Sequence, residues 1–323
     1  MTESAAPNLL LGADIGGTAT RVAVSTVAGE VLGVAAGPAG NPNSVGLEVS
    51  AQRIRTVAEQ CLAQAGCDAA ERVVAGVIGL AGGARADESF PSVVRPTGVR
   101  VRPRLVSDLA VAFSSATPSP EGYVLVAGTG AVAGRILAGE LRERRDGWGW
   151  LLGDEGSGFW LGRQAVRATL TQLQTGVEPL GPLAEAVIGL TGTRDPVAIV
   201  QLCYANPPVW LSTFAELVTR HAEDPVAAAI ATRAAGLLYD TLLDLDLDPV
   251  LPVVLAGSVA TRQGPVREAL RARLDERLRN PVLTAESGLV GALWLAAERL
   301  DRPEETVHTR LARSLSRTSG TVV

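Results

Sequence analysis

One pattern occurs twice in this chain of 323 residues: an apolar strand, a tip of glycine and threonine, a returning strand and a turn. The first copy spans residues 9–34 and the second spans residues 123–140. The tips consist of Gly16, Gly17 and Thr18 in the first copy and of Gly128, Thr129 and Gly130 in the second. Because a repeated supersecondary unit indicates a repeated fold, the pattern predicts two α/β domains of the same fold facing each other. The length agrees, since one hydrophobic core stops growing beyond about 250–300 residues.

Both tips have the composition of an anion-binding turn. Glycines let backbone N–H groups curl around an anion, and threonine hydroxyls add further donors. Asp14 stands on the strand that enters the first tip, where its carboxylate is placed to hold a hydrated Mg²⁺. An ordinary hairpin with a Gly-Gly turn has the same pattern, so neither tip decides the function alone. Two such hairpins from two domains would together clamp a phosphate group.

The charged residues exclude several classes of nucleotide-binding protein. The chain contains no lysine, so all 29 cationic side chains are arginine. A Walker P-loop and a protein kinase each require a lysine, and both classes are therefore excluded. A nucleoside triphosphate would have to be neutralised by Mg²⁺ and backbone N–H groups. The net charge is −5 and the one basic cluster is the short run at residues 142–145, so nucleic acid is not an expected partner.

The remaining compositional signals favour a cytoplasmic protein without a membrane span. No apolar run reaches the ~18 residues that a spanning helix needs, and the N-terminus lacks the features of a signal peptide. The three cysteines, Cys61, Cys67 and Cys203, have no metal-like spacing. We therefore expect reduced thiols, as is usual in the cytoplasm.

A segment rich in glycine and tryptophan, residues 146–162, is the most unusual stretch of the sequence. It holds three of the five tryptophans. Gly147 precedes Trp148, Asp154 follows, and helical periodicity begins after Ser157. Exposed backbone beside a flat aromatic wall, followed by carboxylates and a helix N-terminus, predicts a ligand-binding loop. The alternative is an omega loop packed by its own aromatic side chains.

Two further candidate positions lie where predicted strands end. Asp108 stands where the strand at residues 105–108 breaks into a helix. It is either a general base at the carboxyl end of a strand or a plain helix N-cap. Gly257 and Ser258 follow a buried strand at residues 250–256, and their exposed backbone would suit a ribose or an adenine.

Together these motifs resemble those of a known superfamily. Asp14-Ile-Gly-Gly-Thr18, Gly128-Thr-Gly130 and Gly257-Ser258 are similar to the phosphate-1, phosphate-2 and adenosine motifs of the sugar-kinase, actin and chaperone ATPase superfamily. The span Gly-Trp-Gly-Trp-Leu-Leu-Gly-Asp-Glu-Gly-Ser at residues 147–157 resembles, more narrowly, the N-acetylglucosamine kinase family, which is grouped with the BadF/BadG/BcrA/BcrD-type ATPases. The likeness covers nearly the whole chain, and the motifs occur in the same order.

The resemblance implies an actin-like ATPase fold. Two ribonuclease-H-like domains, residues 1–118 and 119–323, would face each other across a cleft for ATP and sugar, and the last helix would return to the N-terminal domain. The implied activity is ATP-dependent phosphorylation of the 6-hydroxyl of an amino sugar, N-acetylglucosamine first of all. The implied cofactors are ATP and Mg²⁺, and the implied assembly is a homodimer.

The resemblance also assigns roles to residues. Thr18 and Thr129, with the glycines of both tips, would contact the ATP phosphates, and Gly257 with Ser258 the adenosine. Asp108 would accept the proton of the sugar hydroxyl, and Asp14 would hold Mg²⁺ through water. The implied sugar pocket consists of Asn41, for which Asn43 is an alternative, and of Gly147, Trp148 and Asp154.

Other interpretations of the motifs stay open. An activator ATPase for a CoA-ester reductase or dehydratase needs paired cysteines near the second phosphate motif, and none lies between Cys67 and Cys203. A ROK-type glucokinase or repressor would carry a cysteine-rich zinc motif, which the sequence lacks. A non-catalytic sugar-binding regulator is a third alternative. Glucosamine, N-acetylmuramic acid and secondary-metabolite sugars are alternative substrates.

Overall fold

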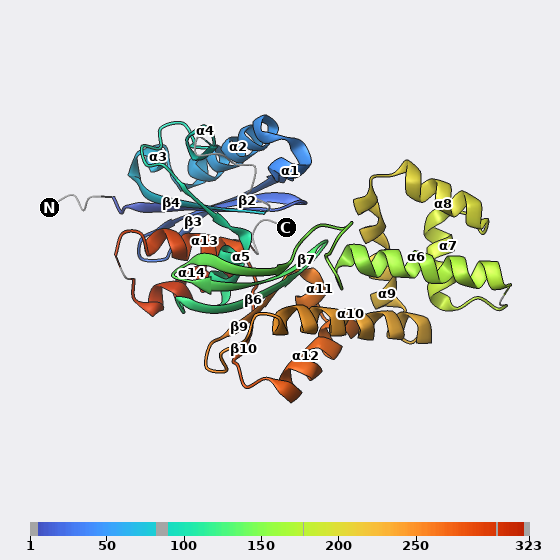
Figure 1. The fold of residues 1–323 in the computed structure, drawn as a ribbon. Helices are drawn as coiled ribbons and strands as arrows, with labels where there is room; N and C mark the ends of the chain where they lie inside the picture. The colour runs from blue at the N-terminus through green and yellow to red at the C-terminus, as the bar shows by residue number, and fades with distance from the viewer. Residues whose placement is uncertain (1–5, 82–89, 177, 302, 320–323) are drawn as a thin grey trace. The chain divides into compact units, whose positions relative to one another are not determined.

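The computed structural model describes residues 6–81, 90–176, 178–301 and 303–319. These residues group into two compact units, each built on a five-stranded sheet (Figure 1). Unit 1 consists of Met1–Gly122, Ile136–Leu141 and Ala285–Val323, and unit 2 of Tyr123–Arg135 and Arg142–Thr284.

The sheet of unit 1 combines a meander with two parallel strands. Its strands are β1 (Leu9–Ile15), β2 (Ala19–Thr26), β3 (Val31–Pro38), β4 (Val73–Leu80) and β5 (Arg104–Ser107). Their order is β3-β2-β1-β4-β5. β2 is antiparallel to β1 and β3, whereas β4 is parallel to β1 and β5. β1 and β4 are buried along almost their whole length, which explains their unbroken apolar sequences.

Helices cover both faces of this sheet. They are α1 (Pro42–Val45), α2 (Leu47–Ala65), α3 (Ala69–Arg72), α4 (Phe90–Val93), α5 (Asp108–Ala116), α13 (Gly288–Ala297) and α14 (Glu305–Ser319). α2 packs on β2 and β3, and α13 packs on β1, β4 and α5 (Figure 1). A Cβ on Gly291 of α13 would lie 2.0 Å from the carbonyl oxygen of Val111, so glycine is needed for α13 to approach α5 this closely.

The second sheet, most of which belongs to unit 2, repeats the same plan. Its strands are β6 (Glu121–Ala127), β7 (Ala131–Leu137), β8 (Glu140–Asp146), β9 (Val253–Ala256) and β10 (Val282–Thr284). Their order, β8-β7-β6-β9-β10, matches that of unit 1 strand for strand, and β9 is parallel to β6 and β10. The prediction of one α/β fold present twice is confirmed. β9 starts later than the predicted strand, because a turn closed by Leu251 N–H on Asp248 O (3.2 Å) precedes it.

The helices of unit 2 build its core against β6. They are α6 (Gly158–Thr175), α7 (Pro182–Thr191), α8 (Pro196–Ala205), the 3₁₀ helix η2 (Pro208–Phe214), α9 (Ala215–Arg220), α10 (Pro225–Leu243), α11 (Ser258–Thr261) and α12 (Pro265–Arg277). The buried aromatic residues of this core include Tyr123, Trp160, Phe214 and Tyr239.

α10 has a composition that needs explanation. It is 19 residues long with a hydropathy of 1.3, so by length and composition alone it is apolar enough to cross a membrane. In the structure 44% of that apolar window is buried, and α10 packs on α6, α9 and α12. Its inner face, from Ala227 to Leu242, lies in the core of unit 2. A core helix meets the same test as a spanning one. Arg233 and Asp240 interrupt the apolar run, which is why the sequence shows no continuous span.

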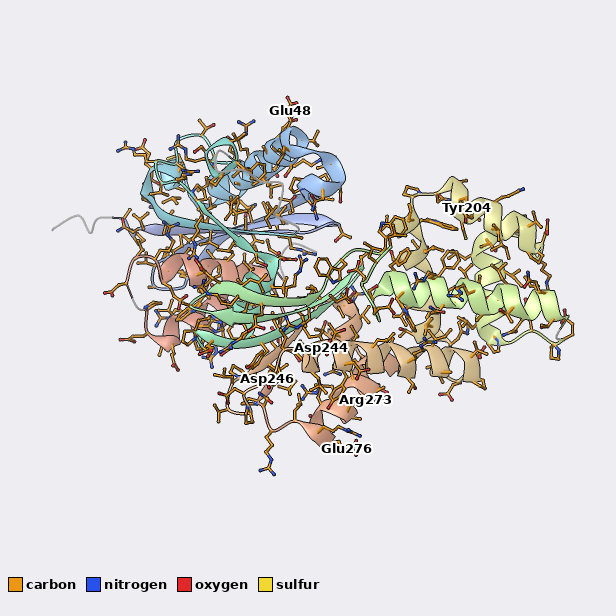
Figure 2. All side chains as sticks on the ribbon, viewed as in Figure 1. Glu48, Tyr204, Asp244, Asp246, Arg273 and Glu276 are labelled. Atoms are coloured by element: carbon orange, nitrogen blue, oxygen red, sulfur yellow. The ribbon has the colours of Figure 1, made fainter. Side chains whose placement is uncertain are left out.

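The aspartates after α10 lie in an exposed turn. Asp244 and Asp246 extend from this turn (Figure 2), and Asp244 is the C-cap residue of α10. Asp248 accepts the Val250 N–H at 3.1 Å. Over the part of the chain that the structure describes, no three or more His, Cys, Asp or Glu side chains form a group that could hold a metal ion.

Candidate active site

The β1–β2 hairpin of unit 1 ends in an open glycine tip. The Gly16 N–H donates to the carbonyl of Ala19 at 3.0 Å, which closes the turn. Gly17 and Thr18 are exposed, and a Cβ on Gly17 would meet no atom within 4 Å. The tip thus leaves space beside its backbone, as an anion-binding turn requires.

Two carboxylates of unit 1 influence each other near this hairpin. Asp14 lies on β1 with 25% of its side chain exposed, and Asp108 is the first residue of α5. Burial raises the pKa of Asp108, and the charge of Asp14 raises it further, against hydrogen bonds from Leu109 and Ser107. Burial also raises the pKa of Asp14, against the Arg21 guanidinium 4.0 Å away. Neighbouring carboxylates with raised pKa values are typical of functional sites.

Asp108 is not the N-cap of α5, so that interpretation is wrong. The N-cap is Ser107, whose hydroxyl oxygen accepts the Leu109 N–H at 3.2 Å. Asp108 Oδ1 accepts the same N–H at 3.0 Å and the Ser107 hydroxyl at 3.3 Å. These bonds orient the carboxylate just beyond the carboxyl end of β5, where α/β sheets place their chemistry.

The donor set of unit 1 fits a hydrated Mg²⁺ held through Asp14. This carboxylate is partly exposed, and its charge raises the pKa of Asp108. A Cβ on Gly288 would lie 2.6 Å from Asp14 Oδ2, so glycine at the start of α13 keeps space beside that oxygen. Magnesium in phosphoryl-transfer sites keeps several waters and takes one or two carboxylates, which these residues provide.

Asn41 lies in a loop that is tied to the same hairpin. The carbonyl of Gly40 accepts the Ser50 hydroxyl at 2.5 Å, and a Cβ on Gly40 would collide with Thr20 Oγ1 at 2.4 Å. Asn41 is the N-cap of α1, and its Oδ1 accepts the Asn43 N–H at 2.8 Å. Since Oδ1 is used locally, the Nδ2 amide of Asn41 is the group suited to a ligand.

In unit 2 the second glycine tip is joined to the start of α6. The Gly128 N–H donates to Gly130 O at 2.9 Å within the tip. The Gly158 N–H donates to Gly128 O at 2.7 Å, and the Phe159 N–H to Thr129 O at 3.1 Å. Thr129 itself is exposed. The first turn of α6 therefore fixes the backbone of the tip.

The tryptophan loop between β8 and α6 exposes its apolar side chains. Trp148 is 65% exposed and Leu152 is 79% exposed, although Trp150 packs on Phe159 with ring centroids 5.8 Å apart. This exposure contradicts an omega loop packed by its own aromatic residues. Asp154 accepts the Ala131 N–H at 3.3 Å, and burial raises the pKa of its carboxyl.

A cavity of about 310 Å³ opens beside the second tip, entirely within unit 2. Gly128, Thr129 and Ser258 are among the residues that line it. Gly257, with φ 82°, permits this approach, since a Cβ there would lie 2.4 Å from Ala127 O. Other lining residues, which the sequence did not indicate, include Ser212, Glu216, Thr219, Arg262 and Arg267.

The structure thus groups the candidates by unit. Asp14, Asp108, the first tip and Asn41 lie in unit 1. The second tip, Gly147, Trp148, Asp154, Gly257 and Ser258 lie in unit 2.

The fold and these motifs define an ATPase-type α/β protein, and comparison with known families agrees. The model of the BadF/BadG/BcrA/BcrD ATPase family matches residues 11–296. The chain belongs to this family, which confirms the resemblance that the motifs carry.

Named relatives narrow the comparison. The chain is 32% identical over 165 residues to an N-acetylmuramic acid/N-acetylglucosamine kinase from Clostridium acetobutylicum, a match that spans about half of each protein (50% of this chain and 53% of the relative). It is 26% identical over 293 residues to an N-acetyl-D-glucosamine kinase from Dictyostelium discoideum, covering 84% of this chain and 92% of that protein. Among solved structures, a proposed N-acetylglucosamine kinase from Chromobacterium violaceum is 29% identical with a TM-score of 0.75, covering 90% of this chain and 99% of that one.

Proposed function

We propose that this protein is an ATP-dependent amino-sugar kinase that phosphorylates the 6-hydroxyl of N-acetylglucosamine. The observation that carries the proposal is the Asp14–Asp108 pair beside the first glycine tip. Asp108 is held just beyond the end of β5, and the charge of Asp14 acts on it. Sugar phosphorylation needs a general base and a metal ligand, and these two carboxylates can serve as one each. The kinase names of two relatives and one structural neighbour support the same conclusion.

Asp108 acts as the general base. Its carboxylate accepts the proton of the sugar hydroxyl as the oxygen attacks the γ-phosphorus, and the bond to the β-phosphate oxygen breaks in line. The Ser107 hydroxyl and the Leu109 N–H hold Oδ1, so the base is oriented before substrate arrives. Asp14 would hold Mg²⁺, which when bound would supply charge neutralisation at the phosphates.

The nucleotide is bound largely by backbone groups. In unit 1 the tip of Gly16, Gly17 and Thr18 offers backbone N–H groups to phosphate oxygens. In unit 2 the tip of Gly128, Thr129 and Gly130 offers a set of the same kind. The adenosine enters the cavity beside Gly257 and Ser258. The volume of this cavity, about 310 Å³, is sufficient for a nucleoside. Arg262 and Arg267 line that cavity and provide positive charge in a chain without lysine.

Each unit offers its own candidate contacts for the amino sugar, at residues 147–154 in unit 2 and at Asn41 in unit 1. Gly147 and Trp148 offer exposed backbone and an exposed indole, and Asp154 offers a carboxylate. Asn41 offers the Nδ2 amide described above. N-acetylmuramic acid is the second candidate substrate, because the relative from Clostridium acetobutylicum is named for both sugars. From the family resemblance we also propose a cytoplasmic homodimer.

The proposal is tested by ADP release with Mg-ATP and each of five additions: N-acetylglucosamine, glucosamine, N-acetylmuramic acid, glucose and buffer. ADP formed only with an amino sugar supports the kinase and names its substrate. Steady ADP release that no sugar changes contradicts the proposal, and points instead to an ATPase that drives a protein partner.

A further inference from the structure

The loop between β8 and α6 is held by a side chain that the proposed function leaves without a role. Asp146, the last residue of β8, accepts the Asp154 N–H on Oδ1 at 2.8 Å and the Glu155 N–H on Oδ2 at 2.9 Å. Its two oxygens thus close residues 147–153 into one loop. Hydrogen bonds to an ionised acceptor are stronger than those between neutral groups, so this carboxylate holds the two ends of the loop together.

The backbone of the loop is arranged around the same carboxylate. Asp146 has φ 58°, in the left-handed region that Asp and Asn tolerate better than other residues with a side chain. A Cβ on Gly153 would lie 2.0 Å from Asp146 Oδ1. Glycine at position 153 is therefore what admits the carboxylate, and the loop conformation depends on both residues.

Contacts continue from the loop to the second glycine tip. Asp154, whose N–H is held by Asp146, has φ 58° and accepts the Ala131 N–H at 3.3 Å. Its Oδ2 lies against Gly130, where a Cβ would approach to 2.9 Å. One carboxylate thus orients a second, and the second contacts the end of the phosphate-binding tip.

We propose that Asp146 is a positioning residue that fixes the tryptophan loop, residues 147–153, relative to the second glycine tip, residues 128–130. The inference rests on the proposed function, because that function assigns Asp154 to the sugar and Gly130 to the nucleotide. Asp146 acts through the backbone N–H groups of Asp154 and Glu155, and the Trp148 N–H lies 3.5 Å from its Oδ1. Loss of its charge loosens the loop and, through Asp154, the tip, so the sugar and nucleotide sites weaken together.

The test variant is Asp146→Asn, which tolerates the same backbone conformation but replaces one acceptor by a donor that faces a loop N–H. The matched control is Asp195→Asn. Asp195 also accepts a backbone N–H, that of Val197 at 3.0 Å, but it caps α8 away from both motifs. We expect KM for N-acetylglucosamine and KM for Mg-ATP each to rise at least about tenfold in D146N, as loss of a charge-assisted hydrogen bond implies. D195N should keep wild-type values.

Hydrogen exchange supplies a readout that does not depend on turnover. In D146N the amides of Asp154, Glu155 and Ala131 should exchange faster than in the wild type and in D195N. Unchanged KM values for both substrates overturn the proposal. Faster exchange confined to Asp154 and Glu155 overturns it too, because the effect then stops inside the loop.

A second variant keeps the test decisive if D146N does not fold. In Gly153→Ala the added methyl group displaces the Asp146 carboxylate from the loop. The same KM and exchange measurements apply to this variant. A wild-type protein that releases no ADP with any sugar contradicts the proposed kinase instead. Exchange at Ala131 in D146N then still decides whether Asp146 controls the tip.

Discussion

A general base at Asp108 must be ionised, but the surroundings of this side chain disfavour the ionised form. Burial and the Asp14 carboxylate raise its pKa above the value of about 3.9 expected in the unfolded chain. Between these two values the native state binds more protons than the unfolded state, so the free energy of unfolding falls as pH rises. The stability that the protonated group contributes is complete below pH about 3.9 and is lost above the folded pKa. An ionised Asp108 therefore destabilises the protein at neutral pH.

Replacing Asp108 by Asn should separate turnover from stability. We expect kcat to fall by roughly 10²–10⁴-fold, the usual contribution of a general base, with KM for the sugar close to the wild-type value. The melting temperature at pH 7 should rise, because the amide keeps the Oδ1 acceptor and removes the repulsion from Asp14. That gain should vanish toward pH about 3.9, where both proteins are uncharged at this position. Steady-state kinetics and thermal melts across pH test both parts, and unchanged turnover would show that Asp108 is not the base.

At the scale of single elements, α13 shows how glycine permits close helix packing. A Cβ at Gly291 would lie 2.0 Å from Val111 O and 2.8 Å from Ser115 N in α5. Gly291→Ala should therefore lower the free energy of unfolding by about 1–3 kcal/mol or more, as overpacking does. Gly189 in α7 is the matched control, because a Cβ there meets nothing within 4 Å. Gly189→Ala should stabilise by roughly 0.5–1 kcal/mol. Urea unfolding measures both variants, and equal shifts would contradict the packing argument.

The cavity in unit 2, which we propose holds the nucleoside, allows a second prediction at this scale. Ser212 lines the cavity from η2, whereas its neighbour Thr213 is exposed and bonds its hydroxyl to Trp210 O at 2.8 Å. Ser212→Trp should fill part of the cavity and raise KM for Mg-ATP at least about tenfold, since the adenosine loses its space. Thr213→Trp places the same indole outside the cavity and should leave KM unchanged. A Ser212→Trp enzyme with wild-type affinity for Mg-ATP would place the nucleoside elsewhere.

The elements also show which features the sequence predicts and which it does not. The hairpins, the tips and one fold present twice follow from local alternation, turn residues and the repeated pattern, and the structure confirms them. Glu216, Thr219 and Arg262 were not predicted to line a cavity. The first two lie in a segment of helical periodicity and the third in a loop, and only tertiary packing brings them together. Asp146 was missed for a similar reason: its partners lie eight and nine residues ahead, beyond any local capping pattern.

On the scale of the whole chain, the C-terminal residues belong with the N-terminal ones in unit 1. His308 of α14 is buried, and its Nε2 lies 2.8 Å from the carbonyl oxygen of Ser114 in α5. A carbonyl only accepts, so this nitrogen carries the hydrogen. The ring also meets Trp294 of α13 edge to face at 5.3 Å. No periodic pattern in the sequence predicts this contact across 194 positions.

This contact makes the stability of the protein depend on pH below neutrality. Burial lowers the pKa of His308, against the Ser114 carbonyl, which favours the protonated ring. Below the unfolded value of about 6.5 the unfolded chain binds a proton that the native ring resists, so the free energy of unfolding falls as pH falls. His308→Gln keeps a donor for the carbonyl but does not titrate. Urea unfolding at several values between about pH 5 and 7.5 should therefore show a shallower pH dependence in the variant than in the wild type. Since every other titrating group is common to both proteins, parallel curves would mean that His308 is not held neutral by burial against α5 and α13.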